Sequence, residues 1–231
     1  MAQTAKVGAA ANKTPRNPHT VNTTEINHSD EPIRLFNSDF LEFFTHITPV
    51  AVLIIWTPVI LFFLARSIVQ ASSSQGWLYI PLGFLVGVFL WTFAEYTLHR
   101  FVFHFDPKSE RLAQFWFMFH GVHHAQPQLK TRLVMPPALS IPLAVLFYFL
   151  YYLVIGKLIG VPQWVDPMFA GFMLGYLVYD MIHYATHHWP MRSGALKYLK
   201  RYHMLHHFKT PQARFGVSSP LWDIVFGTKP A

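Results

Sequence analysis

Four long apolar runs constrain the fold of this chain more than any other feature of its sequence. They cover about residues 49–69, 77–98, 134–155 and 165–182. A helix needs roughly 20 apolar residues to cross the hydrocarbon core of a membrane, and the first three runs reach that length. The chain is 52% hydrophobic and only 13% charged, whereas soluble domains carry about 25% charged residues. The sequence therefore predicts an all-α membrane protein with four transmembrane helices, rather than a soluble helical core.

Lysine and arginine are distributed unevenly among the segments that connect these runs. Residues 71–76 contain none and residues 156–166 contain only Lys157, whereas residues 99–133 contain five and the segment after His183 contains seven. Positive residues collect on the cytoplasmic side of a membrane, so we expect two helical hairpins with both termini in the cytoplasm. The expected location is the endoplasmic reticulum membrane, or the cytoplasmic membrane if the source is bacterial. The net charge of +7 suits anionic membrane lipids, and nucleic acid is not an expected partner.

The N-terminal segment differs from the rest of the chain in composition. Residues 1–33 are polar and lack hydrophobic periodicity, which predicts a disordered tail, and they contain no apolar stretch of the kind found in secretory signal peptides. Residues 34–231 are expected to form one integral membrane domain. At its start, the spacing of Phe40, Phe43 and Phe44 predicts a short helix at the membrane interface.

Eleven of the 14 histidines fall in four tight groups. The groups are His99/His104, His120/His123/His124, His183/His187/His188 and His203/His206/His207. Two groups follow the second apolar run and two follow the fourth, so the predicted topology brings all of them to the cytoplasmic face. The other three, His19, His28 and His46, stand apart, and we interpret each as an interfacial or hydrogen-bonded residue.

The spacing within each group favours metal binding. On an α-helix, side chains three and four residues apart share a face, so each His-x2-His-His group and the pair His183/His187 form a stripe. His99 and His104 are five residues apart and would diverge on an α-helix, so the helix of the second run is expected to bend or end there. His188 points away from the stripe of its own group and is the weakest ligand candidate.

The number and type of these side chains predict a centre with two metals. The chain has no cysteine, and one structural zinc takes only four ligands, so ten histidines imply at least two metals. Imidazole suits iron, zinc, copper and nickel. Three carboxylates, Glu95, Asp180 and Asp223, are candidate acceptors for imidazole N–H groups and would thereby fix the tautomer of the ligands. The alternative for Glu95 and Asp180 is a buried carboxylate that hydrogen-bonds to a neighbouring helix.

These motifs resemble the fatty acid hydroxylase superfamily of membrane enzymes, and within it the fatty acid (sphingolipid) 2-hydroxylases. The likeness runs from about residue 36 to residue 230. It includes the histidine groups, written His-x4-His, His-x2-His-His, His-x3-His-His and His-x2-His-His, and the flanking segments 91–104, 174–184 and 215–228. The histidine groups identify the superfamily, and the flanking segments favour the 2-hydroxylase branch over the sterol and carotenoid branches.

The resemblance implies a fatty acid 2-hydroxylase that inserts one oxygen atom from O2 at C2 of a long acyl chain, in a ceramide or its fatty acid precursor. The histidines would hold two iron ions, although zinc can replace iron at imidazole sites in purified protein. Electrons would come from cytochrome b5 and its reductase. The first 33 residues are too short for a haem domain and lack a His-Pro-Gly-Gly motif, so the cytochrome is expected to be a separate protein.

Two further features are open to two interpretations. Six aromatic side chains near the first two histidine groups could wall the entrance for an acyl chain or embed a helix among lipid headgroups. They are Phe101, Phe103, Phe105, Trp116, Phe117 and Phe119. A cationic segment with Lys197, Lys200 and Arg201 could dock an acidic cytochrome or contact lipid phosphates.

Other functions stand as alternatives. A sterol or carotenoid hydroxylase or a desaturase would use the same oxidant, and the outcome depends on how the substrate is placed. A membrane metal transporter is a remote alternative, because transport sites usually lie near the bilayer midplane. These histidines lie at or beyond the boundary of the membrane.

The predicted orientation implies that two asparagines in N-glycosylation motifs carry no sugar. Asn12-Lys13-Thr14 and Asn22-Thr23-Thr24 match the pattern for N-glycosylation. Because the N-terminus is expected in the cytoplasm, mass spectrometry of protein from a eukaryotic host should find both asparagines unmodified. Sugar on either one would contradict the predicted orientation.

Overall fold

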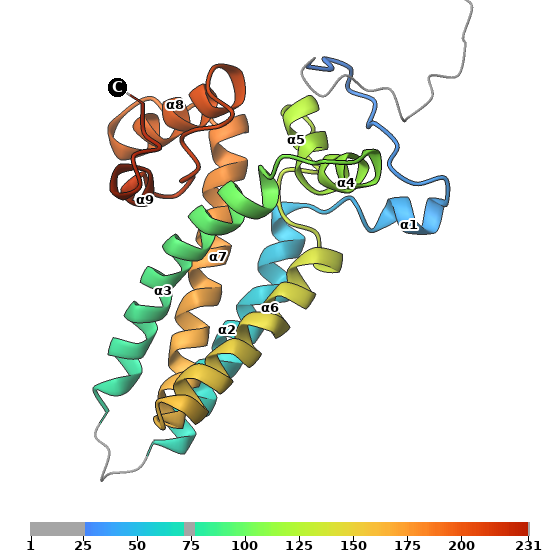
Figure 1. The fold of residues 1–231 in the computed structure, drawn as a ribbon. Coiled ribbons are helices and arrows are strands. Elements are labelled where there is room, and N and C mark those ends of the chain that lie inside the picture. Colours follow the sequence, from blue (N-terminus) through green and yellow to red (C-terminus); the bar gives the residue numbers. More distant parts are fainter. Residues whose placement is uncertain (1–25, 72–76, 231) are drawn as a thin grey trace, which may run out of the picture.

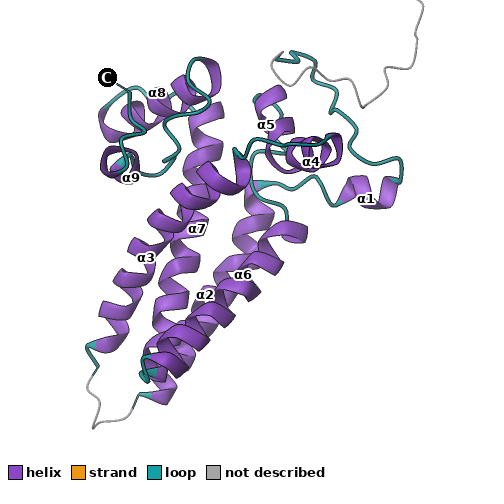
Figure 2. Cartoon of the chain, in the orientation of Figure 1, coloured by secondary structure: helices purple, strands orange, loops and turns teal. Residues whose placement is uncertain are grey.

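A computed structural model describes residues 26–71 and 77–230 of the chain (Figure 1). Within these residues every regular element is a helix and no strand occurs (Figure 2). Four helical stretches are long and apolar enough to cross a membrane: Pro49–Gln70, Tyr79–Phe103, Pro137–Leu158 and Pro162–His188. The predicted fold class, an all-α, multi-pass membrane protein with a histidine-rich cap, is confirmed.

Three of the four spanning stretches change helix type at one end. The first is the α-helix α2 (Pro49–Gln70). In the second, α3 (Tyr79–Thr97) continues as a π-helical turn, η2 (Leu98–Phe103). In the third, α6 (Pro137–Tyr151) continues as η4 (Tyr152–Leu158). In the fourth, a 3-10 turn, η5 (Pro162–Trp164), precedes α7 (Val165–His188).

Two helix ends differ from those expected from the apolar runs. α6 begins at Pro137 rather than near residue 134, because Pro136 is extended and a proline at the first helical position loses no hydrogen bond. α7 continues past residue 182 to His188, and Trp189 is extended. Residues that precede a proline disfavour helical geometry, so Pro190 sets this end. The third histidine group therefore lies on the spanning helix itself.

The shorter helices form a cap at one end of the bundle (Figure 1). One side of the cap contains α1 (Asp39–Phe43), α4 (Glu110–Trp116), the π-helical turn η3 (Phe117–Gly121) and α5 (Val122–Ala125). The other side contains α8 (Gly194–Phe208) and α9 (Leu221–Val225). The segments that follow the second and fourth spanning helices therefore meet at the same end, as two hairpins require.

Helix α1 has the surface that was predicted for an interfacial helix. Ser38 caps its N-terminus, and the side chains of Phe40 and Phe43 are 71% and 74% exposed. Such large apolar side chains on a short helix beside a bundle end suit the boundary between headgroups and acyl chains.

The end of the predicted N-terminal tail makes defined contacts. The Asn27 N–H donates to the Ala125 carbonyl (2.8 Å), and the Ile33 N–H donates to the Gln126 side chain (2.8 Å). The Gln126 amide in turn donates to the Glu31 carbonyl (2.9 Å). Most of the predicted tail, including Asn12, His19 and Asn22, lies outside the described residues, so the domain boundary near residue 33 stays a prediction.

Close packing of α3 against α7 is the main helix–helix contact of the bundle. A Cβ atom on Gly87 of α3 would lie 1.9 Å from the Met168 carbonyl oxygen, and one on Gly171 of α7 would lie 1.9 Å from the Phe84 carbonyl oxygen. Small residues allow membrane helices to approach this closely, which is what holds them together where lipid removes the hydrophobic driving force. Most of the α7 stretch is buried inside the protein, whereas most of each of the other three stretches is not.

An ion pair fixes the opposite end of the bundle. The Arg66 guanidinium on α2 donates to both oxygens of Asp166 at the start of α7, and to the Tyr148 hydroxyl on α6 (2.6 Å). It also lies 5.1 Å from the centre of the Phe63 ring. The only charged residue of the first apolar run therefore joins three helices far from the histidines.

Replacing Gly87 tests the α3–α7 contact. We expect Gly87→Ala to lower the stability of the detergent-solubilised protein by about 1–3 kcal/mol, because the new methyl group meets a backbone carbonyl that cannot rotate away. Gly83→Ala is the matched control, since the atoms nearest to its Cβ would be side-chain atoms of Pro167 and Trp164 at 3.1 Å or more, rather than a backbone carbonyl. Thermal unfolding followed by size-exclusion chromatography measures both, and equal melting temperatures would refute the close contact.

Candidate metal centre

Ten imidazoles converge in the cap as two groups of five. The first group is His99, His104, His120, His124 and His206, and the second is His123, His183, His187, His203 and His207. Within each group the candidate ligand atoms all lie within 4.8 Å of one another. Neighbouring Nε2 atoms are 2.9 to 3.2 Å apart in the first group and 2.9 to 3.0 Å apart in the second.

A π-helical turn explains how His99 and His104 meet despite their five-residue spacing. The helix neither ends nor simply bends at His99, as we expected, but widens into η2. The His104 N–H donates to the His99 carbonyl (3.0 Å), which is the i to i+5 bond that defines a π-helix. This wider turn aligns residues five apart, so both imidazoles face the first group.

The two His-x2-His-His triplets are each divided between the groups. His120 and His124 belong to the first group while His123 belongs to the second, and His203 and His207 belong to the second while His206 belongs to the first. Helix geometry accounts for the division, because a step of four residues turns the side chain by only about 40° whereas a step of three turns it by about 60° the other way. The stripe predicted from the sequence therefore serves two adjacent sites.

The two groups have matching compositions. Each takes a pair from the end of a spanning helix, a pair four residues apart from one side of the cap, and a single histidine from the other side. The single residues are His206 in the first group and His123 in the second. His124 and His207 stack across the boundary with ring centres 4.2 Å apart. Neither group can form unless both sides of the cap are in place.

The protonation of these rings fits metal binding. The Nδ1 atoms of His99 and His206 donate to the carbonyls of Phe215 and Ala213, the latter at 2.7 Å, which leaves an Nε2 lone pair on each ring. Burial lowers the pKa of His104 to about 3, and burial followed by repulsion from neighbouring histidines holds the pKa of His120 and His203 well below the usual value. A neutral imidazole whose Nε2 lone pair points at the other rings of its group can bind a shared cation. The donor set therefore fits one imidazole-bound transition metal per group.

Glu95 and Asp223 bond to backbone N–H groups of a loop in this structure, whereas the sequence suggested them as acceptors for imidazole N–H groups. Glu95 accepts hydrogen bonds from the N–H groups of Val217 (2.6 Å) and Ser218 (2.7 Å). Asp223 accepts from the N–H groups of Phe215 (2.9 Å) and Gly216 (2.7 Å). Both carboxylates thus hold the loop whose carbonyls orient His99 and His206.

Asp180 has an equivalent role beside the second group. It accepts from the Met135 N–H at 3.3 Å through both oxygens, and the nearby Leu133 backbone is a hydrogen-bond partner of His183. Asp180, Glu95 and Asp223 are all buried. Each carboxylate therefore acts on a histidine through the backbone of an intervening loop.

His188 is left out of both groups. Its ring lies against Tyr184, with ring centres 4.9 Å apart, and its buried Nε2 has no hydrogen-bond partner among the described residues. His46, which we expected to be interfacial or hydrogen-bonded, bonds to the Thr131 hydroxyl through Nδ1 (2.7 Å).

Two apolar cavities border the histidines, one on each group. The larger, of about 250 Å³, is lined by His123 together with residues of α1, η3 and α6. The smaller, of about 70 Å³, is lined by His120 and by Phe103, Phe105 and Trp116. Phe119 and Leu139 line both cavities. Four of the six aromatics considered as an entrance wall thus border a cavity, whereas Phe101 and Phe117 do not line either of these two.

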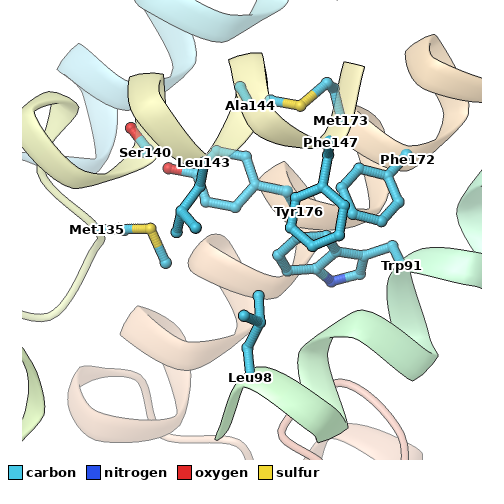
Figure 3. Close-up of a pocket in the computed structure, with 10 residues that line it drawn as sticks. All are labelled: Trp91, Leu98, Met135, Ser140, Leu143, Ala144, Phe147, Phe172, Met173 and Tyr176. Atoms are coloured by element: carbon cyan, nitrogen blue, oxygen red, sulfur yellow. The ribbon is translucent and has the colours of Figure 1, made fainter. Parts of the chain in front are cut away.

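A third space lies deeper in the bundle, between α3, α6 and α7 (Figure 3). Its volume of about 20 Å³ is close to that needed by one water molecule and is too small for an acyl chain. The hydroxyls of Ser140 and Tyr176, both labelled in Figure 3, belong to its lining, and the Tyr176 hydroxyl has Ser140 and Asp180 as side-chain hydrogen-bond partners. Leu98 and Leu143 line this space as well as the smaller of the two cavities beside the histidines.

The spacing of four glycines in the sequence is a signal for the closest helix–helix contact. Gly83 and Gly87 are four residues apart on α3, and Gly171 and Gly175 are four residues apart on α7. This spacing is typical of membrane helices in close contact. It would have predicted that the tightest packing joins the second and fourth spanning helices, which carry the His99 and His183 pairs to the cap.

Four candidate membrane helices with two five-histidine groups at one end define a multi-pass membrane protein with a candidate two-metal centre. The model of the fatty acid hydroxylase family matches residues 84–228. The chain belongs to the fatty acid hydroxylase family.

Similar proteins agree with that membership. The dihydroceramide fatty acyl 2-hydroxylase FAH1 of Arabidopsis thaliana is 42% identical over 85% of this chain and 80% of its own length. The ceramide very long chain fatty acid hydroxylase SCS7 of Saccharomyces cerevisiae is 40% identical over 82% of this chain and 48% of its own length. A solved structure described as full-length scs7p, with only its hydroxylase domain visible, has 38% identity and a TM-score of 0.75 over 84% of this chain and 70% of that one.

Substitutions on one helix can test the division into two groups. His203 and His206 lie three residues apart on α8 but face different groups. We expect His203→Ala and His206→Ala each to reduce bound metal from about two ions per chain to about one, because each removes a ligand from its own site only. His188→Ala is the matched control and should retain the wild-type content. Elemental analysis of protein purified without chelator measures all three, and metal loss in His188→Ala would contradict the grouping.

Proposed function

We propose that this protein is a fatty acid 2-hydroxylase that acts on a long acyl chain of a ceramide or its fatty acid precursor. The observation that carries the proposal is the pair of five-imidazole groups at one end of four membrane helices, beside apolar cavities. The names of similar proteins, which include a dihydroceramide fatty acyl 2-hydroxylase and a mammalian fatty acid 2-hydroxylase, support the position of attack and the lipid substrate.

The ten histidines would hold two iron ions, five imidazoles to each. Iron is preferred to zinc because the reaction needs a redox-active metal, although imidazole binds both. When bound, the two irons would supply the activation of dioxygen for attack on an unactivated C–H bond. His188 is not among the proposed ligands, and Glu95, Asp180 and Asp223 would support the ligands through the loops that they hold.

The proposed reaction consumes one O2, two electrons and two protons. One oxygen atom enters the C–H bond at C2 of the acyl chain, and the other leaves as water. The electrons would come from a partner protein, for which cytochrome b5 with its reductase is proposed. Lys197 and Arg201 are exposed on the outer side of α8, whose inner side carries His203 and His206. An acidic electron donor on that surface would lie close to the metals.

The residues of this chain have three tasks in such a reaction. The bundle admits a substrate that is dissolved in lipid, since the smaller cavity is walled by Val102 and Phe115, both of them half exposed. The aromatic lining excludes water from the metals. The hydrogen-bonded loops keep the Nε2 lone pairs of His99 and His206 directed at the site.

The proposed location is the endoplasmic reticulum membrane, or the cytoplasmic membrane in a bacterium. The cap carries the histidine groups and most of the Lys and Arg residues of the chain. It would face the cytoplasm, where the reductase for a cytochrome is available. Both termini would lie on that side, since four spanning helices return the chain to the side from which it started.

Lipid mass spectrometry provides the test. Cells that lack 2-hydroxylated sphingolipids should regain them when they express the wild-type chain, and His187→Ala should abolish the product because it removes a proposed ligand. His188→Ala alters the adjacent histidine, which belongs to neither group, and should retain activity. The absence of any 2-hydroxyacyl lipid with well-expressed wild-type protein would refute the proposed function.

A further inference from the structure

The two histidine groups match in number but differ in what holds their rings. In both groups the Nε2 atoms are the ones that approach one another, at 2.9 to 3.2 Å. A neutral imidazole that binds a metal through Nε2 carries its proton on Nδ1. That N–H group then needs an acceptor, and metal-binding histidines almost always have one. The two groups can therefore be compared by the acceptors of their Nδ1 atoms.

Two rings of the first group have acceptors in the backbone of one loop. Nδ1 of His99 donates to the Phe215 carbonyl, and Nδ1 of His206 donates to the Ala213 carbonyl (2.7 Å). None of the five Nδ1 atoms of this group is buried without a hydrogen-bond partner among the described residues. No ring of the first group therefore has to bury an unpaired N–H when it binds a metal.

Buried carboxylates fix the loop that carries these carbonyls, residues 213–218. Asp223 accepts hydrogen bonds from two backbone N–H groups of the loop, one at each carboxylate oxygen. Glu95 accepts from the next two N–H groups. A Cβ atom on Gly216 would lie 2.0 Å from the Ser219 carbonyl oxygen, so the backbone turns tightly there. The loop thus keeps its acceptors beside the rings of the first group.

Three rings of the second group have no such acceptor. The Nδ1 atoms of His123, His203 and His207 are buried and have no hydrogen-bond partner among the described residues. By contrast, His183 of the same group has the Leu133 backbone as a hydrogen-bond partner. Burying an N–H donor without an acceptor costs free energy. The second group therefore has the poorer support for its rings.

The missing acceptors penalise the metal-bound form more than the free protein. Without a metal, a ring can carry its proton on Nε2 and donate it to a neighbouring imidazole of the second group, 2.9 to 3.0 Å away. A metal on Nε2 moves the proton to Nδ1, where three of these rings bury it unpaired. In the first group, two loop carbonyls already favour the proton on Nδ1. Metal binding therefore costs more free energy in the second group.

We propose that the two metals are bound unequally, with a tightly held ion in the first group and an exchangeable ion in the second. The inference rests on the proposed function, whose two metals it distinguishes, and it makes Asp223 and Glu95 positioning residues for the tighter ion. Loss of one hydrogen-bond partner of a metal ligand typically lowers the affinity of the site tenfold to hundredfold. Three such partners are missing here, so we expect the two affinities to differ by at least about tenfold.

Zinc release from the wild-type protein tests the proposal at equilibrium. Zinc is the probe because imidazole binds it and it has no redox chemistry of its own. Zinc-loaded protein in detergent, equilibrated with increasing concentrations of a chelator, should lose about one ion per chain in each of two steps at least tenfold apart in free zinc. Anomalous X-ray diffraction after the first step should find the remaining ion in the first group. A single step of two ions, or a remaining ion in the second group, would overturn the proposal.

Two variants of α8 assign the steps independently. His203→Ala keeps the first group intact, so its ion should be released only at the second step. His206→Ala keeps the second group intact, so its ion should be released at the first step. His188→Ala is the matched control and should show both steps as in the wild type, since His188 belongs to neither group. Equal release from His203→Ala and His206→Ala, or the reverse order, would contradict the assignment.

Asp223→Asn tests the positioning role of the carboxylate. The amide leaves only one oxygen to accept from the two loop N–H groups, so the carbonyls beside His99 and His206 are held less firmly. We expect the second step to move about tenfold towards the first while the first step stays in place. A merely structural role would lower thermal stability without bringing the steps closer. Unchanged separation in a variant that elutes as folded protein would overturn the proposal.

The proposed function fails or holds by a different measurement. Iron-loaded wild-type protein that makes no 2-hydroxyacyl product refutes that function, whatever the order of zinc release. Single-step zinc release refutes the unequal sites, whatever the product. The two failures are therefore distinguishable.

Discussion

Each histidine group contains one histidine from the opposite side of the cap, and the rest of the structure depends on this constraint. His206 on α8 completes the group that is built mainly by η2 and η3, and His123 completes the group that is built mainly by α7 and α8. Each site therefore needs both hairpins at once. Two metals bound in this way would join the two sides of the cap across the bundle.

The spanning helices and the loops position the histidine side chains so that both groups can form. α3 and α7 deliver one histidine pair each, and their closest approach is set by Gly87 and Gly171, where no side chain larger than hydrogen fits. At the cap end of these helices, Glu95 and Asp223 hold a loop whose carbonyls fix the rings of His99 and His206. Buried carboxylates are stable there because each accepts two or more hydrogen bonds. The candidate ligands are thus oriented by helix packing within the bundle and by backbone carbonyls of the loop.

Two mostly apolar cavities lie beside this centre. His120 is among the residues that line the smaller one, and His123 is among those that line the larger one. Phe119 and Leu139 line both cavities. Each histidine group therefore borders a space whose walls are largely apolar.

The sequence by itself determined the four spanning helices, the gathering of the histidines at one end and the family, because apolar length and residue spacing are local properties. Its spacing also set His188 apart from the ten histidines that form the two groups. Only the tertiary structure decided which histidines share a site, because a triplet such as His203, His206 and His207 can face one partner or two. The π-helical turn at His99 and the loop contacts of Glu95 likewise depend on segments more than 100 residues away, where the energy of the whole assembly outweighs local preference.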